Sequence, residues 1–169
     1  IGHGSDDHYR GALQADGVTF TRLSEGYYWP GIDFRDRSKD DETCLDDCVI
    51  EHASDGVYCA SSSPTITNSI FRNNIDGVEA DGSSSPILSG NTFTSNQYPV
   101  KIYGNDIDGN LYGNTYVDNM LDDSTASDYI FVYGNSDNGS TEYLNGNKTY
   151  DWLKDGAPYR LTDHIYVYE

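Results

Sequence analysis

The sequence predicts an all-β solenoid, because its central part repeats a short phrase at a nearly constant spacing. The copies begin at Asp47, Asn68, Asn91 and Asn114, which are 21, 23 and 23 residues apart. A period of this length indicates a repeat architecture. Each period of roughly 22 residues holds three short β-like runs with turn residues between them, and no run has helical spacing. This pattern describes the rung of a parallel β-helix, whose rungs stack about 4.8 Å apart.

Three phrases define the rung, and each recurs in successive periods. The first is found at 47–52, 68–73, 91–96 and 114–119, the second at 55–59, 76–80 and 99–103, and the third at 61–66 and 83–88. An echo of 100–105 at 130–135 indicates that a longer excursion interrupts the last rung. We therefore predict a single domain over residues 1–169, with regular rungs at 44–119 and looped-out terminal segments at 1–43 and 120–169.

Alternation along the predicted strands assigns three columns of apolar side chains to the interior. The first column contains Val49, Ile70, Phe93 and Tyr116, the second contains Val57, Val78 and Val100 with Cys59, Ala80 and Ile102 beside it, and the third contains Leu45, Ile66 and Leu88. We expect these columns to form a continuous core.

A structural ladder is expected at one bend, where Asn73, Asn96 and Asn119 fall in register, with His52 in the preceding rung. Stacked side-chain amides can hydrogen-bond to their own copies above and below. Such pairing satisfies buried polar groups that would otherwise destabilise the fold. These asparagines are therefore predicted to be structural.

The acidity of the chain restricts its partners. The formal net charge is −18 and Lys and Arg are few, so nucleic acid and anionic membranes are excluded as partners. No stretch approaches 18 apolar residues, so no membrane insertion is expected. The acidic residues allow two interpretations. They form either a solvated surface, where salt screens the repulsion between carboxylates, or a set of calcium sites, since calcium prefers oxygen ligands.

The calcium alternative has one specific location. Asp106, Asp108 and Asn110 have the alternate spacing of the start of a calcium loop, and the loop of the echoing segment supplies Asp137. The bidentate Glu of an EF-hand loop is missing, and Asp and Asn also favour turns for backbone reasons. Calcium is the one cofactor that the sequence suggests.

The three cysteines lie close together in the sequence. Cys59 falls in an inward column and is expected to be a small buried apolar residue. Cys44 and Cys48 align with outward positions on either side of a bend, where they form either a disulfide or two free thiols. Asn138 and Asn147 begin glycosylation sequons.

Candidate binding residues come from two places. The insertion at 23–31 carries Tyr27, Tyr28 and Trp29, which either stack on a sugar or partner or fold as a cap against the end of the solenoid. The outward column of the second strand contains Asp33, Tyr58, Glu79, Lys101 and Phe131. Glu79 opposite Lys101 predicts a cross-strand ion pair. No nucleophile motif or phosphate loop is found, so no residue is assigned as catalytic.

The phrases SSPTITNSIFRNNIDGV and SSSPILSGNTFTSNQYPV, at 62–78 and 83–100, resemble right-handed parallel β-helix repeats of bacterial and archaeal surface proteins with the pectate-lyase-like architecture. The resemblance covers nearly the whole chain. It implies the fold and an extracellular or cell-surface location, whereas the fold itself hosts lyases, hydrolases, adhesins and inert stalks.

We therefore expect a non-catalytic extracellular structural or interaction module that assembles end to end, as one unit of a filament, stalk or surface layer. Both ends of the sequence have the pattern of strands and show no capping helix, which favours end-to-end assembly. The alternative is a β-helix that binds or cleaves a polysaccharide.

Overall fold

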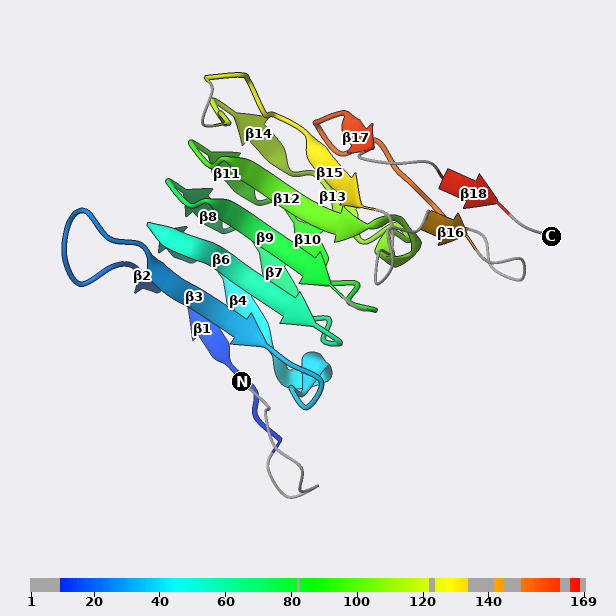
Figure 1. Cartoon of the computed structure of the whole chain (residues 1–169). Coiled ribbons are helices and arrows are strands. Elements are labelled where there is room, and N and C mark those ends of the chain that lie inside the picture. The colour runs from blue at the N-terminus through cyan, green and yellow to red at the C-terminus, as the bar shows by residue number, and fades with distance from the viewer. Residues whose placement is uncertain are drawn as a thin grey trace.

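The computed structural model describes residues 10–81, 83–121, 124–133, 142–144, 150–161 and 165–167. The chain winds into a three-faced solenoid whose parallel rungs stack from the N-terminal part to the C-terminal part (Figure 1). The partners of successive rungs are 21 to 23 residues apart through the regular part of the stack. The predicted all-β parallel β-helix is confirmed.

Three parallel sheets make up the faces of the solenoid. The first sheet contains β1 (Gln14–Asp16), β4 (Cys44–Asp46), β7 (Thr65–Thr67), β10 (Ile87–Ser89) and β13 (Leu111–Tyr112). The second sheet contains β2 (Thr19–Phe20), β5 (Val49–Glu51), β8 (Ile70–Arg72), β11 (Thr92–Thr94) and β14 (Thr115–Val117). The third sheet, called the six-stranded sheet below, contains β3 (Trp29–Phe34), β6 (Ala53–Ala60), β9 (Asp76–Asp81), β12 (Tyr98–Tyr103), β15 (Ile130–Tyr133) and β17 (Tyr159–Leu161).

The remaining elements are short. Two 3-10 turns, η1 (Asp40–Glu42) and η2 (Gly104–Asp106), follow β3 and β12. The strands β16 (Glu142–Leu144) and β18 (Ile165–Val167) form a separate parallel pair, and β16 lies against η2. Among the described residues, no helix has the length and apolarity that crossing a membrane would require.

Two of the predicted inward columns are confirmed. Leu45, Ile66 and Leu88 are partners in the first sheet, and Leu111 continues their column. The valine column and its neighbours in the six-stranded sheet pair in the predicted register. Apart from Leu111 and Ala80, each 1% exposed, these side chains have no exposed surface. The core therefore runs without interruption along the axis of the solenoid.

The predicted first column is wrong by one residue in its N-terminal half. Ile50 and Phe71 point inward with Phe93 and Tyr116, whereas Val49 is partly exposed and Ile70 is 36% exposed. The step from β8 to β11 is 22 residues, because Phe71 pairs with Phe93. The rings stack face to face, with centroids 5.0 Å apart for Phe71 and Phe93 and 5.2 Å apart for Phe93 and Tyr116.

The same slip changes the asparagine ladder, which contains Asn74 in place of Asn73. The Asn96 amide donates to the carbonyl of Phe71 and to Oδ1 of Asn119, and its own Oδ1 accepts from the backbone and side chain of Asn74. Asn73 is exposed and has a φ of 57°. Its role is to adopt the left-handed conformation of the bend, which asparagine tolerates better than most residues.

A second ladder at another bend was not predicted. Asn91 donates its amide to the carbonyl of Ile66 and to Oδ1 of Asn114, and Asn114 does the same toward Leu88 and Asp155. The backbone N–H groups of Ser69, Asn91 and Asn114 are satisfied by the next residue of this ladder. Both ladders therefore satisfy backbone groups where the chain turns between sheets.

The cysteines are free thiols in the structure. Cys59 is fully buried, as predicted, and Cys44 is partly exposed. Cys48 is not outward: it is 1% exposed, and its thiol donates to the carbonyls of Ala15 and Asp46. It points inward because it occupies the ladder bend, where its N–H donates to the hydroxyl of Ser69.

The ladder gives a test of the corrected register. Asn96→Leu should lower the free energy of unfolding by roughly 1–3 kcal/mol, because the groups it serves in two rungs lose their buried partners. Thermal or urea unfolding measures the change. Asn73→Gly is the control, since glycine keeps the left-handed backbone and no ladder bond is lost. A larger loss for Asn73→Gly than for Asn96→Leu would show that the ladder is misassigned.

Candidate functional site

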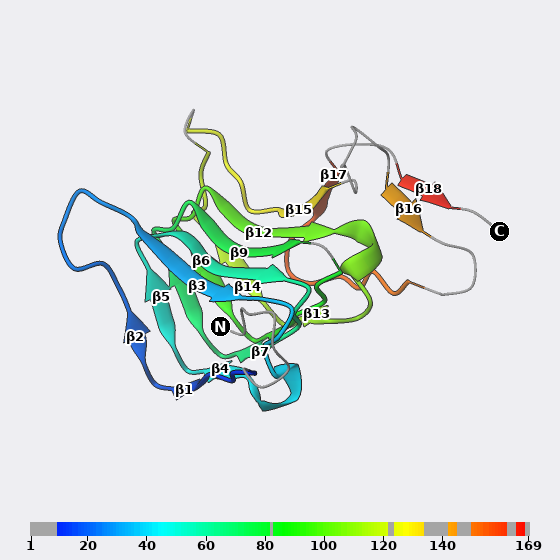
Figure 2. The same cartoon turned by 60° about the horizontal axis from the view of Figure 1, so that its bottom comes forward.

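The outer face of the six-stranded sheet carries a row of functional side chains, one from each rung. Figure 2 shows its strands β3, β6, β9 and β12 side by side along one face. The strand register places the predicted outward residues in this order, and Arg160 of β17 continues the row: Asp33, Tyr58, Glu79, Lys101, Phe131 and Arg160. The sheet spacing brings charges of opposite sign into adjacent rungs.

A cavity of about 270 Å³ opens on this face between β3 and β9. Its lining residues are Pro30, Gly31, Ile32, Asp33, Arg35, Asp55, Tyr58 and Glu79. Gly31 has a φ of 115°, and a side chain there would collide with the carbonyl oxygen of Asp55. The register of β3 against β6 shifts at this glycine, so the cavity lies beside a β-bulge.

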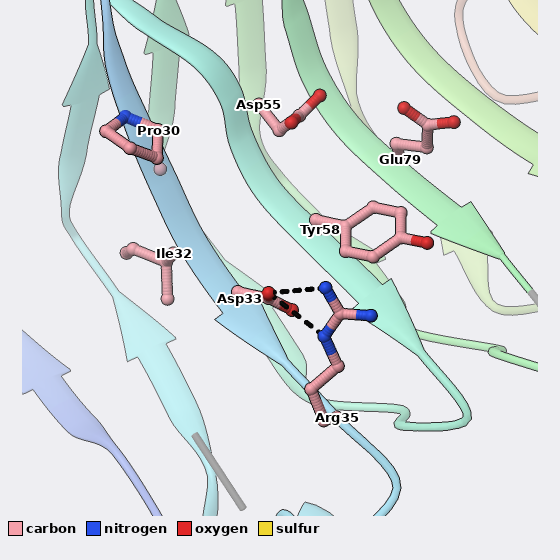
Figure 3. Close-up of a pocket in the computed structure, with 8 residues that line it drawn as sticks. Pro30, Ile32, Asp33, Arg35, Asp55, Tyr58 and Glu79 are labelled. Carbon is pink, nitrogen blue, oxygen red and sulfur yellow. Dashed lines mark hydrogen bonds and ion pairs between the residues drawn. The ribbon is translucent and has the colours of Figure 1, made fainter. Parts of the chain in front are cut away.

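Polar groups converge on the cavity from three strands. The guanidinium of Arg35 donates twice to Asp33, at 3.0 and 2.7 Å, and lies 5.0 Å from the ring centre of Tyr58. Figure 3 shows the Tyr58 ring between this ion pair and the carboxylates of Asp55 and Glu79. The Tyr58 hydroxyl donates to Asp81 at 2.9 Å, which holds the ring in place.

An acidic cluster forms the far side of the cavity. Asp55, Asp76 and Glu79 each place an oxygen within 4.8 Å of the other two. Lys101 of the next rung donates to Asp76 at 2.6 Å and to Glu79 at 3.2 Å, so the predicted ion pair is confirmed and has a second acid. The ammonium also lies 5.0 Å from the ring centre of Tyr98. One cation thus faces three carboxylates.

Asp76 is the most constrained member of the cluster. It is 6% exposed, and its Oδ1 atom accepts no hydrogen bond within the described part of the chain. Burial raises the pKa of Asp76 from 3.8 to about 7; Lys101 opposes the rise, and Glu79 and Asp55 add to it. Burial likewise raises the pKa of Asp55, whose carboxylate lies within 4.8 Å of that of Asp76. Both carboxyl groups are therefore easier to protonate in the folded protein than in the unfolded chain.

The pKa of Lys101 is also raised, which for a lysine favours the charged form. Burial opposes its charge, but the ion pairs with Asp76 and Glu79 outweigh burial and raise its pKa. Lys101 therefore stays charged, and the cluster changes charge by gaining or losing a proton on its carboxyl groups. The same three carboxylates have the chemistry to hold a divalent cation, because hard cations prefer carboxylate oxygen.

The predicted aromatic binding residues fall into different environments. Tyr27 and Tyr28, on the loop between β2 and β3, are 75% and 51% exposed, and the loop projects sideways from the solenoid (Figure 1). It does not fold over the first rung as a cap. The Trp29 indole is anchored, donating to the carbonyl of Glu51 at 2.8 Å. Phe131 is 4% exposed, covered by Tyr98 and Arg160, so its ring offers no platform for a ligand.

The predicted calcium loop is built as a turn. Asn110 accepts the N–H of Asp108 at 2.9 Å and donates to the carbonyl of Pro86 at 2.9 Å. Asp106 is 8% exposed within η2, while Asp108 faces solvent. Asp137 and the sequon residues Asn138 and Asn147 lie outside the described residues. Calcium binding at this loop stays a prediction.

Sequence reasoning did not identify Asp55, Asp76 and Arg35 as site residues. Both aspartates precede a glycine in the repeated second phrase, so they read as turn residues. The repeat could have identified them, because Asp55 and Asp76 occupy the same position in successive rungs. They are partners in the register of β6 and β9, near the outward row.

The raised pKa of Asp76 makes stability depend on pH. Because the folded-state pKa of Asp76 is raised above its ordinary value, the stability it contributes is fully present below about pH 4 and is lost as the pH rises through 7. The free energy of unfolding of the wild type should fall by roughly 1–3 kcal/mol between pH 5 and pH 8. Asp76→Asn should remove most of this slope, as measured by urea unfolding across the range.

Asp46→Asn is the matched control. Hydrogen bonds from Thr67 and Asn68 lower the pKa of Asp46, so its contribution to stability is lost only in acid. This variant should keep the wild-type slope between pH 5 and pH 8. If Asp76→Asn also keeps that slope, the pKa of Asp76 is not raised in the folded protein.

The comparison with known families agrees with this geometry. The family model described as "Right handed beta helix region" matches residues 9–158. No curated protein and no solved structure shows a significant match. The matched segment contains every strand from β1 to β16 and all the residues of the cavity and the acidic cluster. The chain belongs to the right-handed β-helix family.

Proposed function

We propose that this protein is a non-catalytic, extracellular interaction module that binds a saccharide on the outer face of the six-stranded sheet. The observation that carries the proposal is the cavity between β3 and β9, in which Tyr58 lies among carboxylates and one guanidinium. Aromatic rings pack against the C–H faces of sugars, and charged side chains hydrogen-bond to hydroxyl groups. The resemblance of the repeats to surface proteins supports the extracellular location.

The arrangement of the acids supports binding over hydrolysis. Glycosidases place an acid and a second carboxyl group on either side of the scissile bond, about 5–5.5 Å apart in retaining and about 6.5–9.5 Å apart in inverting enzymes. Here Asp55, Asp76 and Glu79 have oxygens within 4.8 Å of one another, and Asp33, on the other side of the Tyr58 ring, is paired with Arg35. Asp76, one of the two acids with a raised pKa, is buried and held by Lys101.

The charge of the face narrows the class of saccharide. Asp33, Asp55 and Glu79 line the cavity, and the one cation among the lining residues, Arg35, is already paired with Asp33. The protein as a whole carries a formal charge of −18. A polyuronate chain would be repelled at this surface, so neutral or amine-bearing saccharides are the favoured ligands.

A binding screen by calorimetry against neutral, amine-bearing and uronate polysaccharides tests the proposal. We expect binding within the first two classes and no release of reducing ends. Tyr58→Ala should weaken binding at least tenfold, because the ring borders the cavity. Tyr112→Ala is the control, since this tyrosine is 48% exposed on β13 in a different sheet. Cleavage of any tested polymer, or equal binding by the two variants, would contradict the proposal.

A further inference from the structure

The six-stranded sheet has two edges, one at each end of the solenoid. Within the described part of the chain, β3 pairs only with β6, and β17 pairs only with β15. The far side of each strand therefore presents backbone N–H and C=O groups without a strand partner. Such edges are templates for pairing with another chain.

The two edges carry matching side chains. Through the register of the whole sheet, Tyr159 falls in the column of Ile32, Arg160 in the column of Asp33, and Leu161 in the column of Phe34. Both strands run in the same direction, because every named pair in the sheet is parallel. One copy placed below another could therefore continue the sheet without a change of face.

We propose that β17 of one copy pairs in parallel with β3 of a second copy, so that the protein self-associates head to tail. This interface goes beyond the saccharide binding proposed above, and the edge strand β3 that it uses also contributes Asp33 to the cavity. The partner is a second copy of this chain, docked by strand addition.

Charge complementarity supports this occupant. The exposed guanidinium of Arg160 would stand directly opposite the carboxylate of Asp33, whose side chain is 46% exposed and pairs with Arg35 in the single copy. Opposite charges at directly paired positions stabilise neighbouring strands, and like charges there destabilise them. In the single copy, Arg160 lies against the rings of Tyr129 and Phe131, so it is held at the edge in an outward position.

Apolar groups at both ends support the same contact. Leu161 is 48% exposed although the inward column it continues is buried. At the opposite end, Ala15 and Phe20 lie in inward columns but are only partly buried. Head-to-tail stacking covers these groups, which removes apolar surface from water.

The proposed contact joins two different surfaces, so it does not close on itself and yields open chains of copies. Each copy carries a formal charge of −18, and repulsion between copies opposes assembly at low ionic strength. Association should therefore strengthen with added sodium chloride, although the Arg160 to Asp33 contact itself is screened. A complex held by opposite charges alone would instead weaken with added salt, so the direction of the salt dependence distinguishes the two kinds of association.

Analytical ultracentrifugation of the full chain in 0.5 M sodium chloride tests the interface. The wild type should show a sedimentation coefficient that rises with protein concentration. Arg160→Glu places Glu opposite Asp33, and Asp33→Arg places Arg opposite Arg160, so each variant alone should remain monomeric. An equimolar mixture of the two variants should associate again, because each head then meets a tail of opposite charge.

Lys154→Glu is the matched control, since it makes the same change of charge at the same end outside the strand register. It should associate like the wild type. If the circular dichroism of Asp33→Arg shows a loss of β-sheet, this variant does not fold, and the sedimentation of Arg160→Glu alone then tests the proposed interface. A wild type that stays monomeric at every concentration, or an Arg160→Glu variant that associates like Lys154→Glu, overturns the proposal. Arg160→Glu should still bind the saccharide, because Arg160 does not line the cavity.

Discussion

The structure depends on satisfying backbone groups at the bends, where the chain leaves one sheet and enters the next. Within the sheets, parallel pairing satisfies the backbone directly, but at the bends N–H and C=O groups are buried without a strand partner. The asparagine ladders supply those partners: Asn96 and Asn91 each accept from the rung before and donate to the rung after. An unpaired buried polar group costs about 1–3 kcal/mol, so the bends set a strict requirement on every rung.

This requirement positions the candidate site. Because ladders and apolar columns hold successive rungs in register, outward residues of adjacent rungs become direct neighbours. Asp76, Glu79 and Lys101 meet because they occupy two consecutive rungs, and no loop has to fold over to bring them together. Burial of Asp76 follows from the same stacking, since Lys101 and its aromatic neighbour Tyr98 lie over it. The raised pKa of this group is therefore a consequence of the repeat.

The sequence predicted the fold and the outward row but missed the register by one residue in part of the stack. Ile70 and Phe71 are both apolar, and Asn73 and Asn74 are both asparagine, so the local pattern fits either alignment. The choice is made by the left-handed backbone at Asn73 and by the stacking of aromatic rings, which are properties of the assembled rungs. The acidic cluster was missed for a related reason: Asp55 and Asp76 lie far apart in the sequence and resemble ordinary turn residues until the rungs are stacked.

The ladders also give the solenoid a direction. Each asparagine donates toward the next rung, so the last residue of a ladder must accept without having to donate. Both ladders end on an aspartate, whose carboxyl oxygens accept: Asp128 accepts from Asn119, and Asp155 accepts from Asn114 and from the hydroxyl of Tyr116. These two bends are thus closed at the C-terminal end, whereas β17 has no strand partner on its far side among the described residues. A solenoid can therefore end its internal polar network and still leave a strand edge for the contact proposed above.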